Sequence, residues 1–333
     1  MVTYSILDLA PIGVGRSTHE SLKECAHVAM TAETSGFERY WLAEHHGMKA
    51  VGSSATSVLL SYVGAKTETI RLGSGGVMLP NHSPLVIAEQ FGTLAELYPH
   101  RVEVGVGRAP GTDMKTAQAL RRNLSDSVDS YPQDIKALQS YFNDGHNGIQ
   151  ATPGHQTHLP IWMLGSSLYS AQLAAELGLP FAFASHFAPD YLIQALTIYR
   201  RLFKPSEQLE RPYVMVGVMA AVAETEEQAD FLMTSSQQQF LNLRRGISAP
   251  FPESVRSMEG VWTPSEKRMV EHTLQYSLSG TKDSVRFKLE RFLEVTKADE
   301  IIASFPIHNS DARLEAIRGF AVAAGSHSSN DTL

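Results

Sequence analysis

Eight short apolar runs recur along the chain, and a helix-like segment separates each run from the next. They occupy Tyr4–Ala10, Arg39–Ala43, Ile70–Leu79, Val102–Arg108, Pro160–Leu164, Pro180–Ser185, Tyr213–Ala223 and Glu300–Pro306. Most of them lack the alternation of a half-buried strand, which is typical of strands that a parallel sheet buries on both faces. The repeated order of strand, helix and strand predicts βαβ units with right-handed crossovers. This count of units favours an α/β fold of the (β/α)8 TIM-barrel type over an open doubly wound sheet.

The boundaries of two helices can be predicted from the sequence. Ser17 and Glu20 have the spacing of a capping box, which predicts a helix beginning at this point. Ser167 is expected to cap a helix over Leu168–Leu177, and Gly178 follows as a C-terminal stop. These helices supply connections between predicted strands, as a barrel requires.

Two connections are longer than the others and predict insertions after the fourth and seventh strands. The stretch 109–159 contains a Gly- and Asn-rich piece at 143–148 that predicts a hairpin turn. The stretch 224–299 contains two regions rich in loop-forming residues, and we expect part of 244–280 to act as a lid, because long loops in compact domains are usually functional. We expect a single barrel domain over 1–325 and a disordered tail over 326–333, which is rich in Ser, Asn and Asp.

Composition and charge exclude several classes of protein. A hydrophobic fraction of 43% with 19% charged residues is ordinary for a globular chain. The 28 basic and 35 acidic residues give a net charge of −7 without any block of like charge, which argues against a nucleic-acid surface or a membrane anchor. Met1–Asp8 lacks a basic lead and is interpreted as a first strand and not as a signal peptide. Since no apolar segment reaches about 18 residues, we expect a soluble, cytoplasmic protein.

Polar or glycine residues stand at the C-terminal ends of most of the apolar runs. In a parallel barrel these ends open onto one face, where the active sites of such barrels lie. The pattern therefore predicts one shared site, whose candidate residues are Glu44, His45, His46, Gly75, Gly76, Arg108, Ser166, Ser167, His186 and His308.

The histidine pair at the end of the second strand has three interpretations: metal ligands, a proton-transfer group or a structural cluster. Adjacent residues of an extended chain point to opposite faces, so His45 and His46 are poorly placed to bind one ion, and we expect no metal. Histidine titrates near neutral pH and is the commonest general acid or base. His45, with Glu44 beside it, is therefore the candidate catalytic group.

The next strand ends suggest binding of a ring and a phosphate. The glycine cluster that contains Gly75 and Gly76 marks either a close approach to a planar ligand or a tight barrel corner. Arg108, at the end of a buried strand, needs an anionic partner, which is either an acidic side chain or a ligand phosphate. Ser166 and Ser167 begin a helix and offer hydroxyl and N–H groups that bind phosphate. His82 and His186 lie on the same predicted face and either line a substrate pocket or form only local hydrogen bonds.

The chain resembles the bacterial luciferase-like flavin-dependent monooxygenase family over nearly its whole length. The resemblance is carried by Gly36–His46, by the Gly-x-Gly-Gly-x-x-Leu-Pro-x-x-x-Pro run in Leu72–Pro84, by Arg101–Arg108 and by Leu164–Gly178. It implies a TIM barrel that binds reduced FMN as a co-substrate and uses O2 to oxidise a small organic substrate. It also implies a separate NAD(P)H-dependent flavin reductase and a homodimer formed through helices near the second and third strands.

The resemblance assigns roles to individual positions. His45 matches the catalytic histidine, and Glu44 would orient it or hold the neighbouring strand ends. Gly75-Gly76 matches a non-proline cis peptide behind the flavin ring. Arg108 and Ser166 match positions that contact the FMN phosphate, and the helix-end argument adds Ser167.

Two departures and several alternatives limit what the resemblance implies. Gly107 replaces a reactive cysteine of luciferase and Gly165 replaces an acidic residue, so cysteine chemistry and light emission do not carry over. A deazaflavin-dependent dehydrogenase that transfers hydride without oxygen, a non-catalytic flavin-binding relative and a metal-dependent barrel hydrolase are the alternatives. The pattern does not identify the organic substrate.

Overall fold

The computed structural model describes residues 2–109, 114–120 and 130–325, and within them the predicted strands close into a barrel. The strands are β1 (Thr3–Asp8), β2 (Arg39–Leu42), β3 (Arg71–Ser74), β4 (Val77–Met78), β5 (Val102–Gly107), β6 (Ile161–Gly165), β7 (Phe181–Phe183), β8 (Val214–Val222), β9 (Leu278–Gly280) and β10 (Glu300–Ser304). Neighbouring strands pair in parallel from β10 through β1 round to β8, and β8 pairs with β10 to close the ring. The predicted TIM barrel is confirmed, whereas the predicted tail over 326–333 lies outside the described residues.

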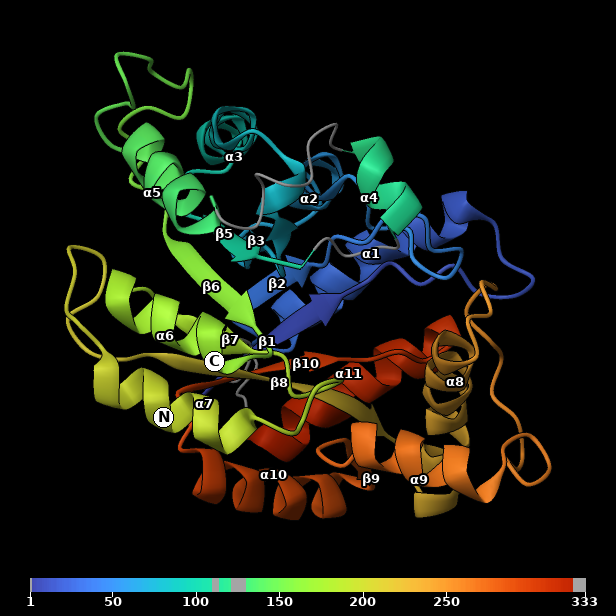
Figure 1. Cartoon of the computed structure of the whole chain (residues 1–333). Helices are drawn as coiled ribbons and strands as arrows, with labels where there is room; N and C mark the ends of the chain where they lie inside the picture. The colour runs from blue at the N-terminus through green and yellow to red at the C-terminus, as the bar shows by residue number, and fades with distance from the viewer. Residues whose placement is uncertain (1, 110–113, 121–129, 326–333) are drawn as a thin grey trace, which may run out of the picture.

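Helices surround the central strands, as Figure 1 shows. They are α1 (Thr18–Thr34), α2 (Thr56–Gly64), the 3-10 helix η1 (Leu79–Asn81), α3 (Pro84–Leu97), α4 (Met114–Leu120), α5 (Tyr131–Phe142), α6 (Leu168–Leu177), α7 (Leu192–Leu202), α8 (Glu226–Arg244), α9 (Pro264–Thr273), α10 (Lys282–Thr296) and α11 (Ser310–Ala324). The predicted capping box is present, with Ser17 as N-cap of α1. Gly178 ends α6 with a left-handed φ of 64°. Within the described ranges, none of the helices has the length and apolar character needed to cross a membrane.

The structure refines the sequence prediction at three places. The third run is not one strand: β3 pairs with β2 and β5, whereas β4, after Gly75-Gly76, pairs with β5. β9 was missed because its three residues are too few for a readable pattern, and it extends the sheet beside the end of β8. In the first insertion the predicted hairpin turn is confirmed by an antiparallel bridge between His146 and Ile149.

Two separate hydrophobic clusters follow from the alternation of side chains along the strands. Residues such as Ile6 and Tyr40 belong to the larger cluster, which packs the strands against the helices. Their neighbours Leu7 and Trp41 belong to the smaller cluster, which fills the inside of the barrel, because successive side chains point to opposite faces. There Trp41 meets Trp162 edge-to-face at 5.2 Å between ring centroids. This pair fills the barrel beneath the C-terminal strand ends.

Candidate active site

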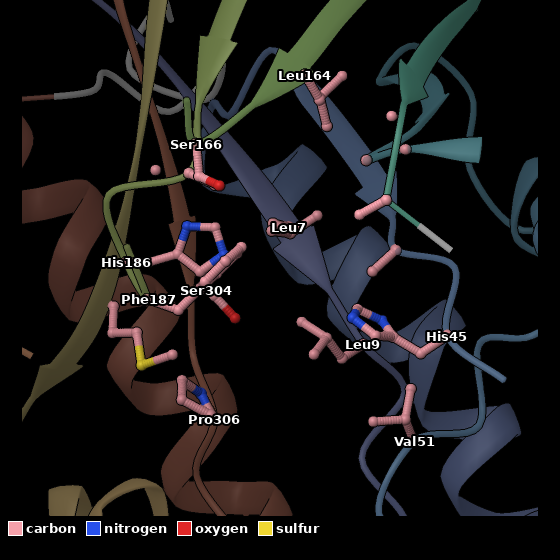
Figure 2. Close-up of a pocket in the computed structure, with 18 of the residues that line it drawn as sticks. Leu7, Leu9, His45, Val51, Leu164, Ser166, His186, Phe187, Ser304 and Pro306 are labelled. Atoms are coloured by element: carbon pink, nitrogen blue, oxygen red, sulfur yellow. The ribbon is translucent and has the colours of Figure 1, made fainter. Parts of the chain in front are cut away.

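A cavity of about 870 Å³ opens at the C-terminal ends of the barrel strands. Six of the seven predicted catalytic and cofactor-binding residues line it, and these are His45, Gly75, Gly76, Arg108, Ser166 and Ser167. His186, which the sequence left open as a pocket residue, lines it as well. Figure 2 shows His45 and His186 on opposite sides, both directed into the space. Closure of the barrel brings these seven residues together at one cavity, whereas Glu44, His46 and His308 of the predicted shared site do not line it. His308 Nε2 instead lies 2.9 Å from the carbonyl oxygen of Val14.

His45 follows the end of β2 and is held by its backbone. Its N–H donates to the carbonyl of Ser53 at 3.2 Å. The buried Nδ1 atom has no hydrogen-bond partner among the described residues. Burial lowers the pKa of His45 below its ordinary value of 6.5, and Glu44 opposes this shift only in part. The imidazole is therefore neutral at neutral pH and keeps a polar group for a ligand.

Glu44 is buried and lies outside the cavity wall, so it does not contact a ligand there. Its Oε1 lies 2.8 Å from His46 Nε2 and 2.7 Å from His82 Nε2, and its Oε2 accepts a 3.3 Å bond from the Met78 N–H. Burial alone would raise the pKa of Glu44, but the hydrogen bonds from both histidines bring it below its usual value. Glu44 was predicted either to orient His45 or to hold the neighbouring strand ends. The geometry supports the second role, because Glu44 connects the end of β2 to β4 and η1. This corrects its placement among the catalytic residues.

The same three side chains form a compact polar cluster. Atoms of Glu44, His46 and His82 that could ligate a metal ion lie within 4.8 Å of one another. Both Nε2 atoms already hydrogen-bond the shared carboxylate oxygen, so protein groups satisfy its charge. His82 is accordingly a structural partner of Glu44 and does not line the cavity. The sequence could not show this pairing, because the two residues follow different strands.

Gly75 and Gly76 are joined by a cis peptide bond, as the resemblance implied. A Cβ added at Gly76 would lie 2.8 Å from the carbonyl oxygen of Gly105 in β5, and one added at Gly75 would lie 2.5 Å from Leu7 Cδ1. The missing side chains therefore make room for the barrel itself, which supports the tight-corner interpretation of the glycines. Their backbone still forms part of the cavity wall.

Arg108 lies at the cavity wall without a carboxylate partner among the residues the structure describes. Its guanidinium carbon lies 4.4 Å from the ring centroid of Tyr169, which the sequence analysis missed. The sequence does show an aromatic residue in the first turn of α6, and this could have indicated a partner for Arg108. This cation–π contact orients the guanidinium, and its N–H groups have no hydrogen-bond partner among the described residues. Of the two predicted partners, a ligand phosphate is the one the geometry favours.

Ser166 and Ser167 differ in what they can offer. Ser167 is the N-cap of α6: its Oγ accepts from the Ser170 N–H at 3.3 Å, and its own N–H donates to Ser170 Oγ at 3.4 Å. Its polar groups are thus engaged within the helix end. Ser166 lies on the cavity wall, where Figure 2 shows its side chain. Both serines line the cavity, but the Oγ of Ser167 already caps α6, and the predicted contact of each with a phosphate stays a prediction.

The fold and the cavity define a TIM-barrel protein with an open cavity at the C-terminal face of its strands. The chain belongs to the luciferase-like monooxygenase family, whose model matches residues 2–301. It is 51% identical to a luciferase-like monooxygenase of Escherichia coli K12 over 95% of each chain. It is 31% identical to an N-acetyl-S-alkylcysteine monooxygenase of Bacillus subtilis, over 93% of this chain and 94% of that one. The family resemblance read from the sequence is confirmed.

Solved structures agree with this assignment. Apo-MsnO8 superposes with a TM-score of 0.92 at 30% identity, covering 98% of this chain and all (100%) of that one. Two more distant structures share the fold. The oxygenating constituent of 3,6-diketocamphane monooxygenase from Pseudomonas putida, in complex with FMN, has a TM-score of 0.73 at 16% identity and covers 96% and 97% of the two chains. An F420-dependent secondary alcohol dehydrogenase has a TM-score of 0.69 at 13% identity and covers 97% and 98%.

Proposed function

We propose that this protein is an FMN-dependent monooxygenase that uses reduced FMN and O2 to oxidise a small organic substrate. The observation that carries the proposal is one cavity in which Arg108 and Ser166 form an anion-binding end and His45 a neutral proton-transfer group. The family membership and the FMN complex of a protein with the same fold support it.

The residues of the cavity fit a flavin mononucleotide. Arg108 provides a positive charge that Tyr169 orients and that no described carboxylate neutralises. It lies in the same cavity wall as Ser166, next to the N-terminus of α6, where backbone N–H groups favour a phosphate. The cavity volume of about 870 Å³ lies within the range of roughly 300–1,000 Å³ that is usual for pockets enclosing small ligands.

When bound, reduced FMN supplies the electrons that activate oxygen. The protein contributes position and proton transfer. Arg108 and Ser166 hold the phosphate, and the backbone of Gly75-Gly76 supports the ring. Neutral His45 accepts a proton at a ring nitrogen and returns it, which is the usual task of a histidine near neutral pH. Phe251, in the predicted lid region, already lies in the cavity wall and helps to exclude water.

Oxygen-isotope labelling tests this proposal. The protein is loaded with FMN, reduced without oxygen and mixed with oxygen-18 gas in the presence of candidate substrates, including N-acetyl-S-alkylcysteines. We expect a product that carries one labelled oxygen atom. Oxidation of a reduced substrate by bound deazaflavin without oxygen uptake would favour the hydride-transfer alternative, for which the F420-dependent relative is the precedent. Tight FMN binding without any oxygen reaction would favour a non-catalytic relative.

The predicted flavin reductase and homodimer are part of the same proposal. Exposed apolar side chains support an interface on the helices near the second and third strands: Val58 on α2 is 70% exposed and Leu97 on α3 is 56% exposed. We expect turnover to require an added NAD(P)H-dependent flavin reductase. Sedimentation is expected to give a dimer for the natural chain and a monomer after Val58→Asp; a wild-type monomer would contradict this part.

A further inference from the structure

The acidic and basic side chains in the cavity wall are all of one sign. Among the described residues that line the cavity, Arg108, Arg244 and Arg313 are basic, and none is an Asp or a Glu. Arg313 is neutralised, because the carboxylates of Asp8 and Glu24 lie 2.6 and 3.3 Å from its guanidinium. Arg108 is the residue proposed to hold the FMN phosphate. The positive charge of Arg244 is therefore left without an assigned partner.

Arg244 is the last residue of α8 and is exposed to solvent. It forms no ion pair within the part of the chain that the structure describes. The next residue, Arg245, pairs with Glu266 at 2.8 Å, so this nearby carboxylate is already engaged. A positive charge in a cleft without opposite charges attracts anions.

Arg244 belongs to one face of α8 that lines the cavity. The residues of this face are separated by steps of three and one, which places them on the same side of a helix, and they are Ser236, Gln239, Phe240, Leu243 and Arg244. Exposure increases along the face, from 1% at Ser236 to 46% at Leu243. The helix therefore runs from the buried part of the cavity to its mouth, where Arg244 lies.

A second polar group on this face has no partner. The Oε1 atom of Gln239 is buried, and no described residue donates a hydrogen bond to it. A buried polar atom without a partner costs free energy, and most such atoms in folded proteins are satisfied. From Gln239 to Arg244 the helix rises by about 7–8 Å. A ligand that lies along α8 can therefore donate to Gln239 and present an anionic group to Arg244.

These two groups lie away from the proposed phosphate site. Arg108 follows β5, whereas α8 follows β8, and both β6 and β7 stand between these strands in the barrel. Figure 1 shows α6, which begins at the proposed phosphate site, and α8 on different sides of the barrel. Arg244 is therefore placed to bind a ligand other than the FMN phosphate.

The same side of the cavity can hold an apolar chain. Phe240 lines the cavity from α8, and Pro306 lines it beside this helix, since its carbonyl oxygen accepts a 3.1 Å hydrogen bond from Ser236 Oγ. Apolar surface of this kind binds hydrocarbon by excluding water. The side that carries Arg244 thus combines an apolar wall, one hydrogen-bond acceptor and one cation.

We propose, resting on the function above, that the organic substrate is a carboxylic acid with an apolar chain and an N–H or O–H group between the two. Arg244 binds its carboxylate at the cavity mouth, where the planar guanidinium suits the two oxygens. Gln239 Oε1 accepts a hydrogen bond from the N–H or O–H group. Arg244 is thus a specificity-determining residue that selects anionic substrates.

Calorimetric titration of the FMN-loaded protein with three matched probes tests this. N-octanoylglycine carries the chain, the N–H group and the carboxylate. N-octanoylglycinamide replaces the carboxylate with a neutral amide of the same shape, and octanoyloxyacetate replaces the N–H group with an ester oxygen. We expect N-octanoylglycine to bind about tenfold more tightly than the amide and about fivefold more tightly than the ester.

Variants assign these differences to residues. Arg244→Met is expected to weaken N-octanoylglycine about tenfold and to leave the amide probe nearly unchanged, whereas Arg244→Lys, which keeps the charge, loses less. Gln239→Leu is expected to weaken N-octanoylglycine about fivefold and the ester probe hardly at all. Arg201→Met is the matched control, because Arg201 is also an exposed arginine in the last turn of a helix, α7, but does not line the cavity. It is expected to change nothing.

The outcomes separate this proposal from the proposed function. Absence of N-octanoylglycine binding, or equal affinity for it and its amide, overturns the anionic substrate class. An equal loss in Arg244→Met and Arg201→Met, with circular dichroism verifying both folds, overturns the contact with Arg244. A fall in the FMN affinity of Arg244→Met assigns this residue to the cofactor and overturns its role here. Failure of the wild type to bind FMN contradicts the cofactor assignment instead, and the same titrations without FMN then decide the role of Arg244.

Discussion

A charged network inside the barrel makes stability depend on pH in a way that one substitution isolates. At the N-terminal ends of the strands, Arg39 lies between two buried carboxylates. Its Nη1 donates to both oxygens of Glu300 at 2.9 and 2.8 Å, and its Nε lies 2.9 Å from Glu103 Oε1. Tyr213 and Ser5 also donate to Glu300. Burial nevertheless raises the pKa of Glu300 to about 7, because Arg39 offsets it only in part and Glu103 adds repulsion.

The sign and size of the effect follow from this shift. The folded protein binds a proton at Glu300 more tightly than the unfolded chain, whose ordinary value is 4.5. Glu300 therefore contributes stability that is full below pH 4.5 and is lost as pH rises through about 7. Between pH 5 and pH 8 the loss is about 2.5 kcal/mol. With an unfolding entropy of roughly 0.7 kcal/mol/K for a chain of this length, that corresponds to about 3–4 °C in Tm.

Glu300→Gln removes the titration and keeps the shape of the side chain. We expect the difference in Tm, variant minus wild type, to become more positive by about 3–4 °C between pH 5 and pH 8. Thermal melting followed by circular dichroism in matched buffers measures it, and the subtraction cancels the titrating groups that do not interact with Glu300. A difference that is constant with pH, or that changes in the opposite direction, refutes the raised pKa and means that Arg39 outweighs the burial of Glu300.

Three further substitutions test other contacts. Arg313 lies 2.6 Å from the Asp8 carboxylate and 3.3 Å from that of Glu24. Arg313→Met leaves buried Asp8 without its charged partner, whereas Glu24 keeps Arg16, and the variant is expected to lower the free energy of unfolding by about 3–5 kcal/mol in denaturant titration. A loss below that of an exposed pair, about 0.5 kcal/mol, contradicts this. Arg108→Met is expected to weaken the affinity for FMN by roughly ten- to hundredfold and to leave the affinity for riboflavin, which has no phosphate, nearly unchanged. Flavin fluorescence measures both affinities, and an equal loss for the two ligands would exclude a phosphate contact. His45→Ala is expected to leave the affinity for FMN near normal, whereas the rate at which oxygenated product forms falls by about 10²- to 10⁴-fold. An unchanged rate would remove His45 from the proposed reaction.

The fold was readable because the barrel buries most of its strands on both faces. β8 is buried along its whole length, and its sequence is correspondingly an unbroken apolar run. The break between β3 and β4 could not be predicted, because Val77 and Met78 continue the apolar run after Gly75-Gly76. Only the pairing separates the two strands: β3 pairs with β2 and β5, and β4 pairs with β5. β9 was missed for the opposite reason, since three residues carry too little pattern.

The candidate site was predictable to the extent that it depends on strand ends. His45, Arg108 and Ser166 each follow an apolar run, and the parallel arrangement alone places them on one face. Partnerships across strands were not predictable. Glu44 was expected beside His45 in the reaction, but its carboxylate faces His46 and His82 instead.

The sequence by itself determined the barrel, the face that carries the site and the family, because these depend on periodicity and on residues adjacent in the chain. Only the tertiary structure decided which polar groups are left for a ligand. Ser167 is engaged in capping α6, Arg108 is oriented by Tyr169, and the ring of His186 fits against Gly217. Burial and closure of the ring bring distant residues together, and the pKa values and unpaired atoms of the site exist only once that packing has formed.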